Sequence, residues 1–159
     1  MRFPERDERW MRRAVELAAR ASGNTRPNPL VGAVIVDNHD RMLGEGWHRQ
    51  AGRPHAEVEA LRDAHEAQHD VAGATMYVTL EPCAHRGRTG PCSDAIAEAG
   101  IQRVVVAMKD PNAQATGGIE RLRSAGIEVD TGCCEEEAIY LNPGFYVFHA
   151  RQRPLATLK

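Results

Sequence analysis

The sequence predicts an α/β fold, a three-layer α/β/α sandwich on a mixed sheet of about five strands. After an expected amino-terminal helix and β-hairpin, segments of helical periodicity alternate with short apolar segments of strand length, which is the order of βαβ crossovers. The 159 residues, 42% hydrophobic and 26% charged, have the size and composition of one soluble domain with its own core.

The first third of the chain predicts a helix and a β-hairpin. In residues 7–22 apolar side chains recur every three or four positions and form one stripe, which predicts an amphipathic helix. Glycine and proline residues then end it. Residues 30–36 and 42–48 are mostly apolar and flank the turn-rich segment 37–40, so we expect two paired strands.

The next hundred residues predict alternating helices and strands. The helical segments space apolar residues three or four apart, and the last two are followed directly by Gly100 and Gly126. The strand segments are short and rich in β-branched residues. We expect helices at 55–67, 91–99 and 119–125, and strands at 74–80, 104–108 and 127–130. Residues 1–150 are expected to form one domain and residues 151–159 a linker.

Charge and hydropathy exclude several classes of partner. There are 20 Lys and Arg against 22 Asp and Glu, and aromatic residues make up 5% of the chain. Proteins that bind nucleic acid normally have a basic face or stacking aromatics, so we expect no nucleic-acid partner. The longest apolar stretch, residues 30–36, is far shorter than the roughly 20 residues that cross a bilayer, so we expect no membrane association. The charged amino terminus lacks the apolar core of a secretory signal, which favours a cytoplasmic protein.

Two segments contain potential metal ligands, His55-Ala56-Glu57 and the loop that begins at Cys83 and ends at Cys92. One imidazole and two thiolates would give Zn²⁺ three protein ligands and leave the fourth position to water. We therefore expect His55, Cys83 and Cys92 to bind zinc, which lowers the pKa of such a water to roughly 7. Glu57 lies two residues beyond His55, where its carboxyl group can act as the catalytic acid and base.

This pattern is close to the signature of zinc deaminases, His-x-Glu followed by Pro-Cys-x-x-Cys, although eight residues separate the two cysteines here in place of two. Each half alone is a common surface pattern, but both halves in the expected order, each beside a predicted helix start, favour a catalytic zinc site. Cys133 and Cys134 precede three glutamates and are expected to cap and solvate a helix start without binding metal. His39, His65 and His69 are expected at the surface.

Six motifs are spread over nearly the whole chain: PNPLVGAV at 27–34, GEGWH at 44–48, HAEV at 55–58, TLEPC at 79–83, RTGPC at 88–92 and DPN at 110–112. Through them the chain resembles one branch of the cytidine-deaminase-like superfamily, the pyrimidine deaminase domain of the bifunctional deaminase/reductase of riboflavin biosynthesis. The resemblance implies the cytidine-deaminase-like fold and a zinc-dependent hydrolytic deaminase. Its substrate would be 2,5-diamino-6-ribosylamino-4(3H)-pyrimidinone 5′-phosphate, and its products the pyrimidinedione and ammonia.

The resemblance also implies roles for individual residues. Zinc would be held by His55, Cys83 and Cys92, with Glu57 as the acid and base, and the substrate would be contacted by Asn28, His48, Arg88 and Asn112. Family members continue into an NADPH-dependent reductase. The resemblance therefore implies a reductase partner, either fused to this domain or separate. Residues 151–159 would then be a linker and the start of that missing domain, or a carboxyl-terminal tail.

Side-chain chemistry agrees with these roles and leaves two of them open. The guanidinium of Arg88, in the long loop, suits the substrate phosphate, and the amide of Asn28 suits a base or sugar edge. An alternative for His48 is a half-buried histidine at a strand end, and the alternative for Asn112 is the Asx turn that often follows Asp-Pro.

Two other functions are alternatives to this one. A deaminase of another base, of a nucleoside or of tRNA adenosine is the nearest alternative, and the slightly acidic charge and the long cysteine loop argue against tRNA. A catalytically silent zinc-binding module is the second, and Glu57 argues against it because a structural zinc takes a fourth protein ligand and needs no proton shuttle. Helices exposed on a compact sheet favour a homo-oligomer.

Overall fold

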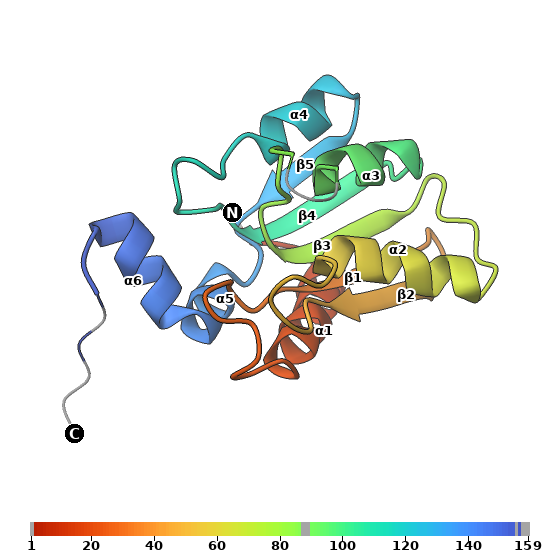
Figure 1. Cartoon of the computed structure of the whole chain (residues 1–159). Helices are drawn as coiled ribbons and strands as arrows, with labels where there is room; N and C mark the ends of the chain where they lie inside the picture. The colour runs from red at the N-terminus through yellow and green to blue at the C-terminus, as the bar shows by residue number, and fades with distance from the viewer. Residues whose placement is uncertain (1, 87–89, 155, 157–159) are drawn as a thin grey trace.

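The computed structural model describes residues 2–86, 90–154 and 156. Five strands form one sheet in the order β2-β1-β3-β4-β5, and helices cover both of its faces (Figure 1). The strands are β1 (Gly32–Val36), β2 (Met42–Trp47), β3 (Thr75–Leu80), β4 (Arg103–Met108) and β5 (Glu128–Thr131). The helices are α1 (Glu5–Ala19), α2 (Ala56–Glu66), α3 (Cys92–Glu98), α4 (Gly118–Ser124), α5 (Glu135–Leu141) and α6 (Pro143–Arg151). The predicted three-layer α/β/α sandwich on a five-stranded mixed sheet is confirmed.

The sheet is mixed because the hairpin and the crossover units pair differently. β1 pairs antiparallel with β2 and with β3, whereas β3, β4 and β5 run parallel, with Leu80 opposite Met108. The carboxyl ends of parallel strands meet at one edge of a sheet, which is where ligands bind in open α/β folds. The loops that follow β3 and β4 therefore meet at this edge.

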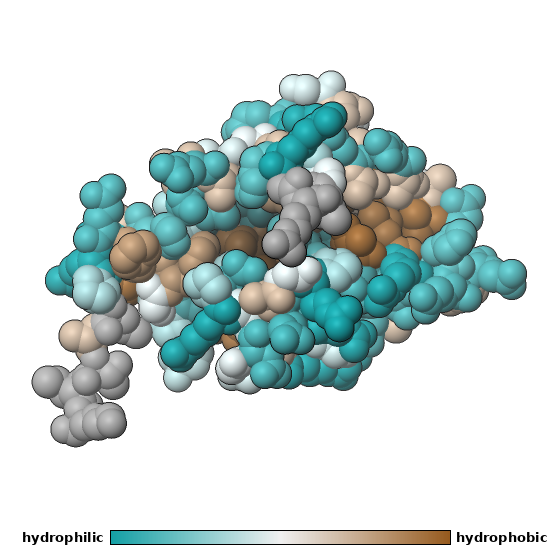
Figure 2. Space-filling view, viewed as in Figure 1, coloured by the Kyte–Doolittle hydropathy of each residue, from teal (hydrophilic) through white to brown (hydrophobic). Residues whose placement is uncertain are grey.

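The two faces of the sheet are covered by different helices. α1 and α5 pack on one face, and α2, α3 and α4 on the other. α2 lies directly on β2, because a Cβ atom at Gly46 would come within 2.6 Å of the Ala60 backbone nitrogen and one at Gly44 would overlap the Ala60 carbonyl oxygen. Apolar side chains show between the helices, whose outer surfaces are mainly hydrophilic (Figure 2). α2 thus sits closer to the sheet than a strand with side chains would allow.

A buried ion pair ties α1 to the centre of the sheet. The carboxylate of Asp7, 2% exposed, accepts hydrogen bonds from Tyr77 Oη at 2.7 Å and from the Arg103 guanidinium at 2.8 and 3.1 Å. Arg103 also donates to Asp130 at 2.7 Å. Burial would raise the pKa of Asp7, but the bonds from Arg103 and Tyr77 outweigh it and hold that pKa below its usual value.

Most predicted elements lie within two or three residues of the observed ones. The missed element is α6, which extends to Arg151 and so overlaps the start of the predicted linker at 151–159. α6 has no buried residue and no clear apolar stripe, so no periodicity predicts it. The linker residues 155 and 157–159 lie outside the described part of the chain. Across the described residues, no helix is both long and apolar enough to cross a bilayer.

The expectation for the cysteine pair at α5 is wrong. Cys133 is fully buried in the core and is not solvated. Cys134 is the residue that precedes α5, but its side chain makes no capping hydrogen bond to the helix. The three glutamates that follow do form the first turn of α5, as their charge predicts. Their charge does not, however, predict whether the side chains of the preceding cysteines are buried. His39, His65 and His69 are exposed, as expected.

Candidate zinc centre and substrate pocket

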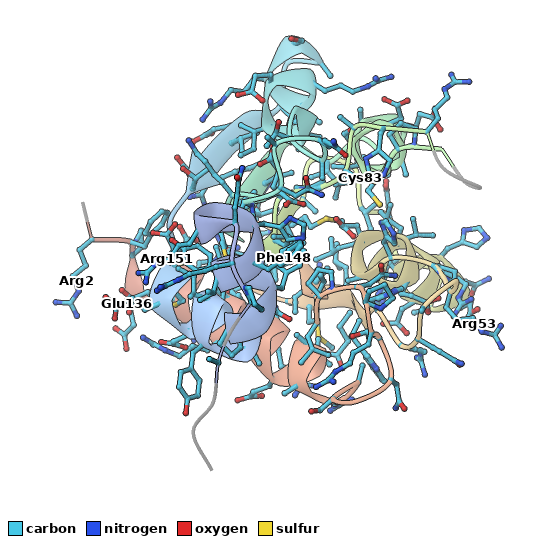
Figure 3. All side chains as sticks on the ribbon, turned by 60° about the vertical axis from the view of Figure 1, so that its left-hand side comes forward. Arg2, Arg53, Cys83, Glu136, Phe148 and Arg151 are labelled. Atoms are coloured by element: carbon cyan, nitrogen blue, oxygen red, sulfur yellow. The ribbon has the colours of Figure 1, made fainter. Side chains whose placement is uncertain are left out.

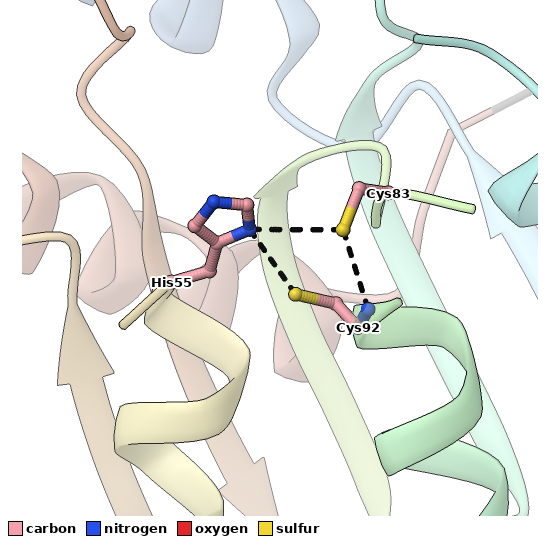
Figure 4. A group of neighbouring side chains, drawn as sticks. All are labelled: His55, Cys83 and Cys92. Carbon is pink, nitrogen blue, oxygen red and sulfur yellow. Dashed lines mark hydrogen bonds between the residues drawn. The ribbon is translucent and has the colours of Figure 1, made fainter. Parts of the chain in front are cut away.

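Three segments bring the predicted ligands together at the edge where the parallel strands end. His55 is the residue that precedes α2, Cys83 lies in the loop after β3, and Cys92 is the first residue of α3. Both helices therefore point their amino-terminal ends toward the group, where the partial positive charge of the helix dipole favours thiolates. Figure 4 shows the three side chains converging from these separate elements.

The distances fit one tetrahedral ion. Nδ1 of His55 lies 3.2 Å from Sγ of Cys92 and 3.7 Å from Sγ of Cys83, and all three ligand atoms lie within 4.8 Å of one another. Zinc bonds of about 2.3 Å to sulfur and about 2.0 Å to nitrogen, at the tetrahedral angle, place ligand atoms about 3.5 Å apart. The backbone N–H of Cys92 also donates to Sγ of Cys83 at 3.2 Å, which orients that sulfur.

The pKa shifts of the Cys83 and Cys92 thiols indicate that a positive charge is needed between them. The hydrogen bond from the Cys92 thiol, with help from His55, lowers the pKa of Cys83 well below its usual value. The same hydrogen bond and burial raise the pKa of Cys92, because its thiolate would face a second negative sulfur. Without a metal the pair therefore keeps one proton. A divalent cation removes the repulsion and allows both sulfurs to be thiolates, so the residues present fit zinc.

Glu57 lies in the first turn of α2 and lines the same pocket as His55 and Cys83. Its side chain is buried, with 3% of the residue exposed. Burial raises the pKa of its carboxyl group, opposed by a hydrogen bond from its own backbone amide and by the nearby His55. A carboxyl group that is held beside the ligands, but is not one of them, is placed to exchange protons with a water at the open coordination position.

The ligand group opens into a cavity of about 220 Å³. The cavity contains three of the four predicted substrate contacts, Asn28, His48 and Asn112. The fourth, Arg88, lies outside the described residues. The other residues that line the cavity are Pro29, Val31, Leu80, Glu81, His85, Asp110, Ala115 and Phe145.

His48 is buried, and both of its ring nitrogens are engaged. Nδ1 lies 3.1 Å from the carbonyl oxygen of Pro54, and Nε2 lies 3.3 Å from Nδ2 of Asn28. A carbonyl oxygen only accepts, so we assign the proton to Nδ1, which leaves Nε2 to accept from the Asn28 amide. Burial lowers the pKa of His48, which favours this neutral form. His48 directly follows β2 and is buried, not half-buried as the strand-end interpretation expected, and its contact with the substrate stays a prediction.

Of the two alternatives for Asn112, the Asx turn is confirmed, whereas the contact with the substrate stays a prediction. Oδ1 of Asn112 accepts from the backbone N–H of Gln114 at 3.1 Å, which is an Asx turn, and the Asn112 side chain lines the pocket. The turn engages the amide oxygen as an acceptor, and the amide nitrogen of Asn112 has two N–H groups that can donate to a ligand.

The sequence analysis did not single out Glu81, Asp110 and Phe145, whereas the long cysteine loop was expected to bring His85 near the zinc. Glu81 and Asp110 stand inside quoted motifs, TLEPC and DPN, and their position at the ends of β3 and β4 could have indicated them. His85 is in the cysteine loop. Phe145 comes from α6, which flanks the pocket and also carries the exposed Phe148 (Figure 3). Nothing local to the sequence predicts that contact.

Comparison with known proteins decides the family. Residues 4–108 match the model of the cytidine and deoxycytidylate deaminase zinc-binding region. The chain belongs to this family. The matched range ends at the last residue of β4 and includes all three residues of the ligand group as well as Glu57.

The similar proteins come from riboflavin biosynthesis and from nucleotide deamination. The riboflavin biosynthesis protein RibD of Aquifex aeolicus is 54% identical over 98% of this chain and 43% of its own length. The crystal structure of a diaminohydroxyphosphoribosylaminopyrimidine deaminase/5-amino-6-(5-phosphoribosylamino)uracil reductase of Thermotoga maritima is 45% identical, with a TM-score of 0.90 over 94% of this chain and 43% of that chain. The dCMP deaminase of cyanophage S-TIM5 is 28% identical, with a TM-score of 0.65 over 81% of this chain and 98% of that chain.

These matches confirm the resemblance inferred from the motifs and the expectation of a zinc-binding deaminase domain. This chain spans less than half the length of the RibD relatives it matches. The match with the phage deaminase covers nearly all of that chain.

Proposed function

We propose that this chain is a zinc-dependent hydrolytic deaminase of 2,5-diamino-6-ribosylamino-4(3H)-pyrimidinone 5′-phosphate, with the pyrimidinedione and ammonia as products. The observation that supports deamination is the group of three ligands, His55, Cys83 and Cys92, with the buried carboxyl of Glu57 in the same pocket. The substrate is proposed from the similarity to RibD proteins and to the Thermotoga deaminase/reductase.

His55 Nδ1 and the sulfurs of Cys83 and Cys92 would hold zinc, which when bound would activate a water for attack on the ring carbon that bears the amino group. Glu57 takes the proton that this water loses. The carboxyl group then gives it to the ring nitrogen next to the attacked carbon. The hydroxyl group now on that carbon loses a second proton, which passes by the same carboxyl group to the amine; the carbonyl forms, the carbon–nitrogen bond breaks, and ammonia leaves. Burial separates the Glu57 carboxyl from bulk water during these transfers.

The polar lining would orient the pyrimidine. The Asn28 amide, oriented by His48, offers its oxygen and its second N–H to the substrate, and Asn112 offers an N–H. We further propose that Arg88 binds the phosphate, because a guanidinium forms paired hydrogen bonds with phosphate oxygens. These groups bind and orient, whereas Glu57 moves protons.

We also propose that residues 1–150 form the deaminase domain and that residues 151–159 either link it to a second domain or end it as a tail. The product would be reduced by a reductase, fused to this domain or separate, as the name of the Thermotoga protein pairs the two activities. Self-association as a homo-oligomer is part of the proposal, and sedimentation at several concentrations tests it.

The first experiment measures zinc and ammonia. The purified protein should contain about one zinc per chain and should release ammonia from the diaminopyrimidine ribotide faster than from the dephosphorylated compound, dCMP or cytidine. Faster release from dCMP or cytidine would support the alternative, a deaminase of another nucleotide or nucleoside. Zinc without ammonia release from any of the four compounds would support a silent zinc-binding module.

A further inference from the structure

We infer that Glu81 is a positioning residue that holds the loop between β4 and α4 against the pocket. The inference rests on the proposed function and extends it. It identifies Glu81 as the residue that positions two of the polar groups that line the pocket. Glu81 directly follows β3, two positions before Cys83, and is 6% exposed. Its backbone N–H donates to the carbonyl oxygen of Met108 at 2.9 Å, which fixes its own position at the end of β4.

The Glu81 carboxylate accepts three backbone hydrogen bonds from the segment that follows β4. Oε2 accepts from the N–H of Asp110 at 3.1 Å. Oε1 accepts from the N–H of Gly117 at 3.1 Å and from that of Ile119 at 3.4 Å. One side chain therefore fixes both ends of the loop 110–117, and the charge strengthens each bond.

The fixed loop carries the polar groups of one wall of the cavity. Asp110 and Asn112 line the pocket, and the N–H of Asn112 donates to the Asp110 carboxylate at 2.8 Å. Gly118 packs against the Cys83 loop so closely that a Cβ atom there would overlap the carbonyl oxygen of Pro82. The loop has no regular structure of its own, so its place depends on these contacts.

Only a carboxylate satisfies all three donors. Both of its oxygens accept, whereas a glutamine at this position has one accepting oxygen and an NH₂ group. In Glu81→Gln that NH₂ must face either the N–H of Asp110 or those of Gly117 and Ile119. Donors that face donors lose their hydrogen bonds, so one end of the loop is released.

The effect should appear in substrate binding more than in chemistry. The loop contributes Asn112 to the pocket, whereas Glu57 and Cys92 lie on α2 and α3 and His55 directly precedes α2. A misplacement of about 1 Å in a positioning group costs up to about a hundredfold in rate at low substrate concentration. We therefore expect KM to rise at least about tenfold in Glu81→Gln, with kcat within about threefold of the parent.

The test compares Glu81→Gln, Glu81→Asp and the control Glu45→Gln in the zinc-loaded protein. Glu45 is a partly buried carboxylate on β2 that pairs with Arg13 at 2.8 Å and does not line the pocket. Three quantities are measured: zinc per chain, kcat and KM for the ribotide, and amide hydrogen exchange across residues 110–119. We expect faster exchange and raised KM in Glu81→Gln, a smaller rise in Glu81→Asp, which keeps both accepting oxygens, and parent values in Glu45→Gln.

Four outcomes would overturn the inference: loss of zinc in Glu81→Gln, a fall in kcat with KM unchanged, unchanged exchange in 110–119, or an equal rise of KM in Glu45→Gln. If Glu81→Gln fails to fold, Glu81→Asp decides by the same measurements. Hydrogen exchange and zinc content need no turnover. A parent protein that releases no ammonia would therefore refute the proposed function, while exchange at 110–119 would still decide whether Glu81 holds the loop.

Discussion

Two glutamates on α2 offer a matched test of the proton shuttle. Glu57 and Glu59 lie two residues apart in the first turn of the helix, and both are buried, at 3% and 5% exposed. The carboxyl of Glu57 lines the pocket, whereas that of Glu59 pairs with Arg62 and lies 3.8 Å from Arg49. Changing either residue to glutamine removes one carboxyl group from α2. The two changes differ in whether that carboxyl group lines the pocket.

Glu57→Gln should keep zinc and lose turnover. The three ligand atoms belong to other side chains, and glutamine has nearly the volume of glutamate, so the pocket keeps its shape. An amide cannot take up the proton from water. General acid–base catalysis contributes typically 10²–10⁴-fold, so we expect kcat to fall by about that factor, or about 3–5 kcal/mol in activation free energy.

Glu59→Gln should change stability and not turnover. Loss of the partner of Arg62 is expected to lower the free energy of unfolding by about 1 kcal/mol, with kcat and KM within about threefold of the parent. The assays are zinc per chain by atomic absorption and ammonia release under saturating substrate. A Glu57→Gln protein that retains more than a tenth of kcat, or a Glu59→Gln protein that loses as much as Glu57→Gln, would refute the proton-transfer role.

The group of three zinc ligands, the proposed phosphate contact of Arg88 and the buried ion pair of Asp7 with Arg103 give three further predictions. Removal of zinc with a chelator should abolish ammonia release and lower the thermal midpoint, and added zinc should restore both, as followed by calorimetry. Arg88→Ala should raise KM for the phosphorylated substrate and not for its dephosphorylated form, and equal discrimination in variant and parent would contradict a phosphate contact. Arg103→Met should lower the free energy of unfolding by about 3–5 kcal/mol at pH 7 in urea titrations, because it leaves the Asp7 carboxylate buried without its cation. Since Arg103 holds the pKa of Asp7 below 3.8, this contribution is present above that pH and is lost as the pH falls through and below it, so the difference between variant and parent should shrink in acid.

The fold was predictable where the sequence is periodic. The stripe of α1 and the β-branched runs of the central strands are local patterns that reflect burial, and each predicted its element. α6 was missed because its residues are only partly buried, so its apolar positions carry no clear helical period. Cys133 was misjudged for a related reason: its buried state depends on α1 packing over α5, which no neighbouring residue indicates.

The site was predictable as chemistry and less so as geometry. His55, Cys83 and Cys92 could be selected because few residue types bind zinc and their order is distinctive. Glu81 could not, because its role consists of hydrogen bonds to three backbone amides distant in sequence, and backbone amides leave no mark in the residue pattern. Phe145 reaches the cavity only because α6 folds back beside it.

The glycines of β2 bear on how the metal centre tolerates mutation. Because Gly44 and Gly46 have no side chains, α2 packs in direct contact with the backbone of β2, and His55 directly precedes that helix. Any larger residue at either position would lift the helix and carry the imidazole away from the two sulfurs. Metal affinity in this protein is therefore sensitive to substitutions on a peripheral strand that contains no ligand.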